Sequence, residues 1–279
     1  MSSSCDSCPS NVPGGCSNED KQSCARPLAL EASDVKKVIA VMSGKGGVGK
    51  STVTSLLASG LSKQGLKVGI LDADITGPSI PKMFGSQGKR LDFNALGMMP
   101  AETGGGIKMV SMNLLLEKES DPVIWRGPMI AGVVKQFWEE VVWGDLDYLL
   151  VDLPPGTGDV PLTVMQSLPV TGVVVVTSPQ ELVQMIVRKA IKMAEVVKLP
   201  VLGLVENLSY GICPDCGKEI PLFGASQGEQ ITKETGIPFL GRLPLDPRLV
   251  SDADNGNLEQ FQADYLEPLV KRFLGSMKN

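Results

Sequence analysis

The chain has 279 residues, of which 43% are hydrophobic and 20% are charged, a composition typical of globular proteins with a large core. Its net charge of −5 and pI near 5.0 exclude a globally basic surface, so no nucleic-acid partner is expected. No apolar run approaches the roughly 20 residues of a membrane helix, and no signal-peptide pattern opens the chain. We therefore expect a cytoplasmic protein that does not enter a membrane. Histidine is absent, which excludes His general bases and His-containing metal sites.

Residues 1–33 are rich in Ser, Cys, Gly, Pro and Asn and lack apolar periodicity, which predicts a flexible extension without a core of its own. The cysteines of this segment are Cys5, Cys8, Cys16 and Cys24. The first two have the spacing of a metal chelate, and thiolate-only ligation suits zinc or an iron–sulfur cluster. The alternative is a tail of free thiols. Residues 34–279 are expected to form the folded domain.

The strongest motif is a glycine-rich loop that fits the pattern G-x-x-x-x-G-K-S/T, namely Gly44-Lys45-Gly46-Gly47-Val48-Gly49-Lys50-Ser51-Thr52. An apolar strand is predicted before it at 38–42 and a helix after it at 51–63, the setting of a phosphate-binding loop. Glycines let backbone N–H groups approach phosphates closely. We expect Lys50 to reach the β- and γ-phosphates of a nucleoside triphosphate and Ser51 to ligate Mg²⁺.

Lys45 is a second lysine among the variable positions of this loop. Spacing alone allows two interpretations. Lys45 is either a solvated side chain or a catalytic group that reaches a nucleotide held by a second subunit.

Carboxylates follow two predicted strands. Asp72 and Asp74 come after a strand at 66–71, and Asp152 ends an apolar strand at 148–152. In parallel α/β sheets, ligands bind at the carboxyl ends of the strands. We expect Asp152 to hold Mg²⁺ in the Walker-B manner, Asp72 to support its ligand shell, and Asp74 to orient the attacking water. The alternative for one of the first two is a structural loop cap.

A second cysteine pair, Cys213-x2-Cys216, lies between a predicted strand and a predicted helix. Two thiolates make half of a four-sulfur metal site. A thioredoxin-like redox pair and an inert pair are the alternatives. Redox pairs usually open a helix, whereas Pro214 and Gly217 indicate a knuckle-shaped turn, which favours metal.

Strands and helices are expected to alternate along the remaining chain. Further strands are predicted at 107–112, 172–177, 201–205 and 238–241, and further helices at 125–143, 180–197, 223–236 and 258–274. This alternation predicts an α/β fold with a doubly wound, mostly parallel sheet flanked by helices. The last helix has few basic residues, so we expect it to pack on the core and not on a membrane.

Together, the loop at 44–52, the segments that begin at Asp72 and Asp152, and Glu206-Asn207-Leu208-Ser209-Tyr210 with its cysteine pair resemble the Mrp (ApbC) family. Its members are P-loop ATPases that carry and assemble iron–sulfur clusters, within the superfamily of MinD, ParA and the nitrogenase iron protein. The loop resembles the deviant Walker-A loop of that superfamily, in which the extra lysine acts in trans across a nucleotide-sandwich dimer.

This resemblance implies an ATPase with ATP, Mg²⁺ and a 4Fe–4S cluster. It implies that Cys213 and Cys216 hold the cluster between two subunits of a homodimer or related heteromer, that Asn207 lies at the adenine, and that apo iron–sulfur proteins receive the cluster. The tail is similar to that of the eukaryotic scaffold branch, which holds a second cluster. Its cysteine gaps of 2, 7 and 7 residues nevertheless differ from the long first gap and two short gaps of that branch.

Two other functions remain open on the sequence. A positioning ATPase of the MinD or ParA kind would share the nucleotide motifs but needs no cysteine pair. A zinc-stabilised nucleotide-binding protein would need the pair, because thiolates alone do not name the metal.

Overall fold

The computed structural model describes residues 27–74, 79–114, 127–179, 183–213 and 215–278. Its main sheet has the strand order β12-β9-β8-β1-β7-β2-β6-β5, and every pair is parallel except the one between β5 and β6. The strands are β1 (Asp34–Ser43), β2 (Val68–Asp72), β5 (Ala101–Glu102), β6 (Lys108–Ser111), β7 (Asp145–Asp152), β8 (Gly172–Thr177), β9 (Val201–Glu206) and β12 (Phe239–Arg242). The predicted fold class is confirmed.

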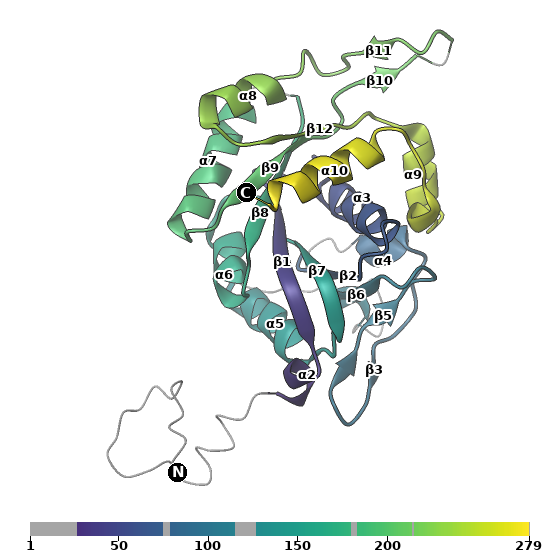
Figure 1. Ribbon diagram of the computed structural model, residues 1–279, viewed down its shortest axis with the longest axis vertical. Coiled ribbons are helices and arrows are strands. Elements are labelled where there is room, and N and C mark those ends of the chain that lie inside the picture. Colours follow the sequence, from purple (N-terminus) through teal and green to yellow (C-terminus); the bar gives the residue numbers. More distant parts are fainter. Residues whose placement is uncertain (1–26, 75–78, 115–126, 180–182, 214, 279) are drawn as a thin grey trace.

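Helices cover both faces of this sheet. Figure 1 shows α3 and α10 on one face and α5, α6 and α7 on the other. The helices are α2 (Leu28–Glu31), α3 (Lys50–Ser62), α4 (Ile80–Met83), α5 (Gly127–Glu140), α6 (Asp159–Ser167), α7 (Val183–Val196), α8 (Gly228–Thr235), α9 (Pro247–Asp254) and α10 (Leu266–Ser276), with short 3₁₀ turns η1 (Met112–Leu114) and η2 (Leu258–Gln260). Two hairpins stand apart from the sheet: β3 (Asp92–Phe93) with β4 (Met98–Met99), and β10 (Gly211–Ile212) with β11 (Glu219–Ile220).

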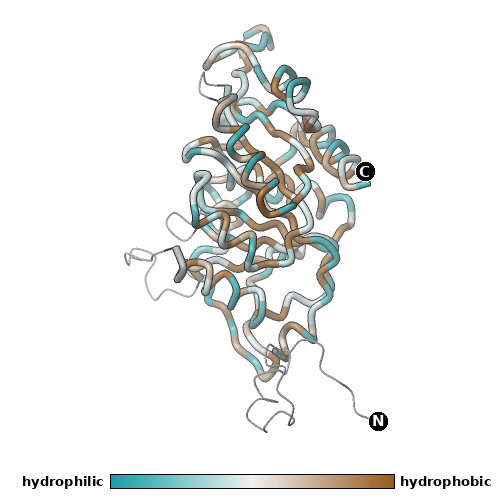
Figure 2. Tube along the Cα trace, turned by 90° about the vertical axis from the view of Figure 1, so that its left-hand side faces the viewer, coloured by the Kyte–Doolittle hydropathy of each residue, from teal (hydrophilic) through white to brown (hydrophobic). Residues whose placement is uncertain are grey.

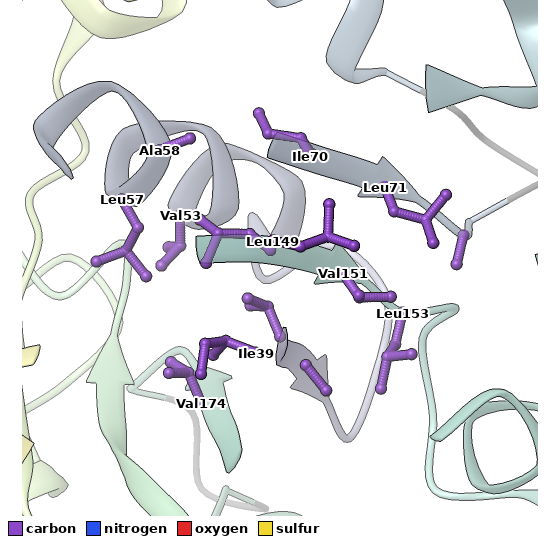
Figure 3. Packing of buried hydrophobic residues seen from close by; sticks show 14 of the residues in the cluster. Ile39, Val53, Leu57, Ala58, Ile70, Leu71, Leu149, Val151, Leu153 and Val174 are labelled. Atoms are coloured by element: carbon purple, nitrogen blue, oxygen red, sulfur yellow. The ribbon is translucent and has the colours of Figure 1, made fainter. Parts of the chain in front are cut away.

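The centre of the sheet is apolar on both faces, as parallel strands between two helical layers must be. Residues 38–43 of β1 and all of β8 are buried. Figure 3 shows Val53 and Leu57 of α3 lying over Leu149 of β7, with Ile39 of β1 close by. Each such side chain contributes roughly 1.5–3 kcal/mol on burial. Figure 2 shows the hydropathy of each residue, with hydrophobic segments at the centre of the molecule and hydrophilic segments towards its outside.

The first described residues already belong to the folded body. Residues 28–31, which were expected to lie in the flexible extension, form α2. Ala29 of this helix is buried. The hydroxyl of Ser33 donates to the carbonyl of Ala29 at 2.6 Å and accepts from the backbone N–H of Trp143 at 2.9 Å. The structured part therefore begins by residue 28.

Two predicted helices differ from the observed ones. The helix predicted at 258–274 begins only at Leu266, because Phe261 is buried in an extended conformation and its carbonyl accepts from Lys63 Nζ at 2.6 Å. The helix predicted at 223–236 begins only at Gly228, where a buried carboxylate accepts the first N–H groups. Helices α2, α4, α6 and α9 were not predicted. Within the described ranges, no helix has both the length and the hydrophobicity to cross a bilayer.

Candidate functional site

The glycine-rich loop joins β1 to α3 at the carboxyl edge of the sheet. Gly47 and Gly49 have φ values of 79° and 75°, the left-handed region that favours glycine. A Cβ atom on Gly49 would lie 2.2 Å from Asn207 Nδ2, so any side chain at this position would clash with Asn207. The loop lines a pocket of about 290 Å³ together with Asp74, Ser79, Met83 and Pro155.

Lys50, the first residue of α3, lines this pocket and is only 5% exposed. Its Nζ lies 2.8 Å from Asp152 Oδ2 and 3.9 Å from Asp74 Oδ2. The approach to Asp152 is not that of a directed hydrogen bond, and Nζ has no hydrogen-bond acceptor among the described residues. A buried ammonium of this kind, at the start of a helix and beside a loop of glycine N–H groups, fits a phosphate group.

Asp152 ends β7 and is fully buried. Its Oδ2 accepts from Ser51 Oγ at 2.5 Å, and its Oδ1 accepts from Thr54 Oγ1 at 2.8 Å. The structure thus brings the predicted magnesium ligands Ser51 and Asp152 into contact. Sequence reasoning missed Thr54, whose only signal is its position one helical turn after Lys50.

Asp72 lies opposite Asp152 in the pairing of β2 with β7 and is almost fully buried. Its carboxylate accepts from the backbone N–H of Asp74 and from Ser111 Oγ, each at 3.2 Å. Burial, and after it the negative charge of Asp152, raises the pKa of Asp72 to about 8. A cation bound between the two carboxyl groups would relieve this repulsion.

No group of three or more Cys, Asp or Glu side chains within the described residues is arranged to hold a metal ion alone. The oxygens of Ser51, Asp152 and Asp72 nevertheless suit Mg²⁺, which keeps several waters and takes further ligands from phosphate. These donors fit a Mg²⁺–nucleotide complex better than an ion bound by protein only. Lys45 is half-buried and lines the same pocket.

Asn207 directly follows β9, and its side chain contacts the glycine-rich loop. Its Nδ2 donates to the carbonyl of Val48 at 2.9 Å. A second pocket of about 270 Å³ adjoins this contact. Its walls come from the loop, from Asn207 and Leu208, and from the segment 244–254 that includes α9. Sequence reasoning missed that segment, because nothing in its composition marks a binding site.

Cys213 and Cys216 lie at the tip of the β10–β11 hairpin, which Figure 1 shows projecting beyond β12. The turn is closed by hydrogen bonds from Cys213 N–H to Lys218 O and from Gly217 N–H to Cys213 O, both at 2.9 Å. Cys213 is half-exposed and Cys216 is exposed. Hydrogen bonds from the backbone N–H groups of Cys216 and Asp215 lower the pKa of the Cys213 thiol. The pair lies in a hairpin and does not open a helix, unlike the usual redox pair.

The four N-terminal cysteines, Cys5, Cys8, Cys16 and Cys24, lie outside the described residues. Their role stays a prediction.

Comparison with known proteins identifies the family of the chain. A family model described as ParA, NUBPL iron-transfer P-loop NTPase, matches residues 34–274. The chain belongs to this family. The family and the carrier class of ATPase predicted from the motifs are thereby confirmed.

Three similar proteins illustrate the range of the family. An iron–sulfur cluster carrier protein of Clostridium perfringens is 47% identical over 258 residues, which cover 90% of this chain and 89% of that protein. A cytosolic Fe-S cluster assembly factor NUBP2 homolog of Trichoplax adhaerens is 44% identical over 80% of this chain and 86% of its own length. A solved structure of a nucleotide-binding protein in complex with ADP from Archaeoglobus fulgidus is 46% identical, with a TM-score of 0.78, and covers 87% of this chain and 96% of that one.

Proposed function

We propose that this protein is an ATP-hydrolysing carrier that holds a 4Fe–4S cluster on Cys213 and Cys216 of two copies and passes it to apo iron–sulfur proteins. One observation carries the proposal. Asn207, which contacts the phosphate loop, and the cysteine hairpin both follow the end of the same strand, β9. Nucleotide and cluster would therefore be bound by parts of one short segment.

In the nucleotide site, the loop N–H groups and Lys50 would bind the phosphates, and Ser51, Asp152 and Asp72 would hold Mg²⁺. The metal supplies charge neutralisation of the β- and γ-phosphates. Asp74 lines this pocket with its Oδ2 3.9 Å from Lys50 Nζ, and we assign it to the attacking water. The pocket beside Asn207 fits the adenine side of the nucleotide. The complex of the Archaeoglobus fulgidus relative with ADP supports nucleotide binding at this fold.

The cluster site needs a second copy of the chain. A cuboidal iron–sulfur cluster takes four thiolates, and the hairpin supplies two. A twofold axis beside the hairpin doubles two ligands into four, and closed twofold dimers are the commonest oligomers. The same axis would bring Lys45 towards the nucleotide of the partner subunit. We assign Cys5, Cys8, Cys16 and Cys24 to a separate thiolate site on the extension.

The names of two relatives support the proposed setting in the cell. The Clostridium perfringens relative is named an iron–sulfur cluster carrier and the Trichoplax adhaerens relative a cytosolic assembly factor. We extend the carrier role and the cytoplasmic location to this chain on that basis.

Anaerobic reconstitution with ferrous iron and sulfide tests the proposal. The wild-type chain is expected to take up iron and sulfide in equal amounts, and Cys213→Ala or Cys216→Ala to lose the share bound by the hairpin. Zinc retained without sulfide, at a content unchanged by reconstitution, would favour the zinc-stabilised alternative. Iron uptake that is identical in both cysteine variants would remove the hairpin from the site.

A further inference from the structure

Glu206, the last residue of β9, is fully buried and has no role in the nucleotide site described above. Its Oε1 accepts a hydrogen bond from Ser209 Oγ at 2.6 Å. Its Oε2 accepts from the backbone N–H groups of Gln227 and Gly228 at 3.1 and 3.0 Å. Those N–H groups start α8, and the positive end of a helix stabilises a carboxylate. Hydrogen bonds to a buried carboxylate are stronger than those between neutral groups, so all three donors are held firmly in place.

The donors lie on opposite sides of the cysteine hairpin. Ser209 precedes β10, and Gln227 follows β11. One carboxylate therefore joins the two ends of the segment 210–226, which carries both cysteines. The hydrogen bonds to Gln227 and Gly228 also explain why α8 begins there and not at residue 223 as the sequence predicted.

A second contact holds the hairpin from outside. The Arg242 guanidinium, at the end of β12, lies 5.0 Å from the centre of the Tyr210 ring and pairs with Glu219 of β11 at 3.1 Å. Both charged side chains are exposed, and exposed ion pairs contribute little. The buried carboxylate of Glu206 is thus the stronger of the two restraints on the base of the hairpin.

The entry to the hairpin is further fixed by backbone bonds. The N–H of Ser209 donates to Leu243 O at 2.9 Å, and the N–H of Leu245 donates to Tyr210 O at 2.7 Å. The exit approaches the sheet very closely, because a Cβ atom on Gly228 would lie 2.3 Å from the Phe239 ring. With the entry fixed to the strand, the hydrogen bonds of Glu206 to the exit set how the hairpin leaves the sheet.

We propose that Glu206 is a positioning residue for the iron–sulfur site: its carboxylate closes the loop 210–226 and so fixes where Cys213 and Cys216 point. The proposal rests on the proposed binding of the cluster by these two cysteines. Groups that orient metal ligands without touching the metal typically change metal affinity about 10–100-fold when they are removed.

Iron release is the first test. It uses the full chain with the four tail cysteines replaced by Ser, reconstituted anaerobically and challenged with a ferrous chelator. Glu206→Ala is expected to release iron about tenfold faster or more. Glu206→Gln is expected to restore most of the retention, because its amide still accepts from the helix N–H groups and can donate to Ser209. Release from Glu206→Ala at the wild-type rate would overturn the proposal.

Glu259 provides a matched control. Its carboxylate also joins two groups, Thr103 Oγ1 at 2.5 Å and the Gly105 N–H at 3.1 Å, but in a different loop. Glu259→Ala is expected to lower stability and leave iron release unchanged. Equal acceleration in Glu259→Ala and Glu206→Ala would mean that general destabilisation is responsible, and would overturn the assignment.

Hydrogen exchange of the metal-free chain separates this proposal from the proposed function. Glu206→Ala is expected to speed exchange in residues 210–226 about tenfold, against little change elsewhere. If the wild-type chain binds no iron through Cys213, the cluster proposal fails while this measurement still tests the closure of the loop. Where Glu206→Ala does not fold, Ser209→Ala removes one of the three bonds and should show the same pattern more weakly. Wild-type exchange and release in Ser209→Ala, or a uniform rise in exchange over the domain, would overturn the proposal.

Discussion

Lys50 and Asp74 both line the nucleotide pocket but are expected to act at different steps. Lys50→Ala removes the buried ammonium that fits the phosphates, so ATP binding should be lost. Asp74→Asn should spare binding and slow hydrolysis about 10²–10⁴-fold, the usual contribution of a group that handles protons or water. Equilibrium binding of ATP and single-turnover hydrolysis measure the two effects separately. An equal loss of binding in both variants would remove Asp74 from the catalytic role.

Asp72 should make the nucleotide-free protein less stable as the pH rises. Its pKa is about 8 in the folded chain, above the ordinary value of 3.8. The folded carboxyl therefore stays protonated between these values while the unfolded one ionises. The free energy of unfolding is therefore highest below about pH 4. It falls as the pH rises towards 8, by at most about 1.4 kcal/mol per pH unit.

Asp72→Asn cannot ionise, so its gain in melting temperature over the wild type should grow from pH 5 to pH 8. Thermal unfolding without nucleotide measures this gain. Adding Mg²⁺ and ATP should reverse the order, because the wild-type carboxylate then has a cation. A gain that is independent of pH would contradict the raised pKa.

Individual site residues could be predicted where each belongs to a recognisable local motif. Lys50 and Ser51 belong to the glycine-rich loop and Asp152 ends an apolar strand, and the three lie together in the structure. Thr54, Ser111 and Glu206 were not assigned a role, because no local motif marks their contacts. The bond from Thr54 to Asp152, for example, spans 98 positions, and no local pattern records it.

At the scale of elements, α9 is expected to depend on its first residues. The carboxylate of Asp246 accepts from the backbone N–H of Arg248 at 2.9 Å and from its guanidinium, which lowers the pKa of Asp246. Asp246→Ala should cost about 0.5–2 kcal/mol of unfolding free energy, the usual effect of losing a helix cap. Denaturant unfolding at pH 7 without nucleotide measures this cost.

The pH dependence of this cap has the opposite sign to that of Asp72. A lowered pKa stabilises the fold above the ordinary value of 3.8, and the contribution is lost as the pH falls through the folded pKa. Asp246→Asn keeps the cap but does not titrate. The advantage of the wild type over Asp246→Asn at pH 7 should shrink towards pH 3. If the difference in unfolding free energy between the two proteins did not change with pH, the charge of Asp246 would not contribute to stability.

Elements were predictable where local pattern and tertiary structure agree. The strand at 172–177 was predicted with its observed bounds, because it is apolar throughout and buried on both faces. Helix α9 was missed although its sequence contains an N-terminal helix signal, Asp246 followed by Pro247 at the first helical position. No such signal shows that the helix predicted from residue 258 begins only at Leu266. The apolar residues of that segment are periodic, and only the contact of Phe261 O with Lys63 Nζ shows why the chain is extended at Phe261, after the short turn η2.

For the whole molecule, we expect a dimer, because a 4Fe–4S cluster takes four thiolates and each hairpin supplies two. A chain whose tail cysteines are replaced by Ser should, after reconstitution, contain about four irons per two copies. Lys45→Ala should keep the cluster-bound dimer and lose the acceleration of hydrolysis that the partner subunit provides. Sedimentation with iron analysis measures the first effect, and steady-state hydrolysis at increasing protein concentration measures the second. A stable four-iron cluster on a monomer would refute the bridging arrangement.

The sheet order also has a consequence for how the chain is made. Strand β1 pairs with β7 and β8 and with no strand close to it in the sequence. Ribosomes add about 5–20 residues per second, so on the order of 5–20 s separate the synthesis of Ser43 from that of Asp152. During that interval an apolar strand lacks both of its neighbours, and such unpaired strands promote aggregation. The nascent chain should therefore depend on chaperones most before residue 152 emerges, and a ribosome that stalls within residues 44–152 should leave an aggregating fragment.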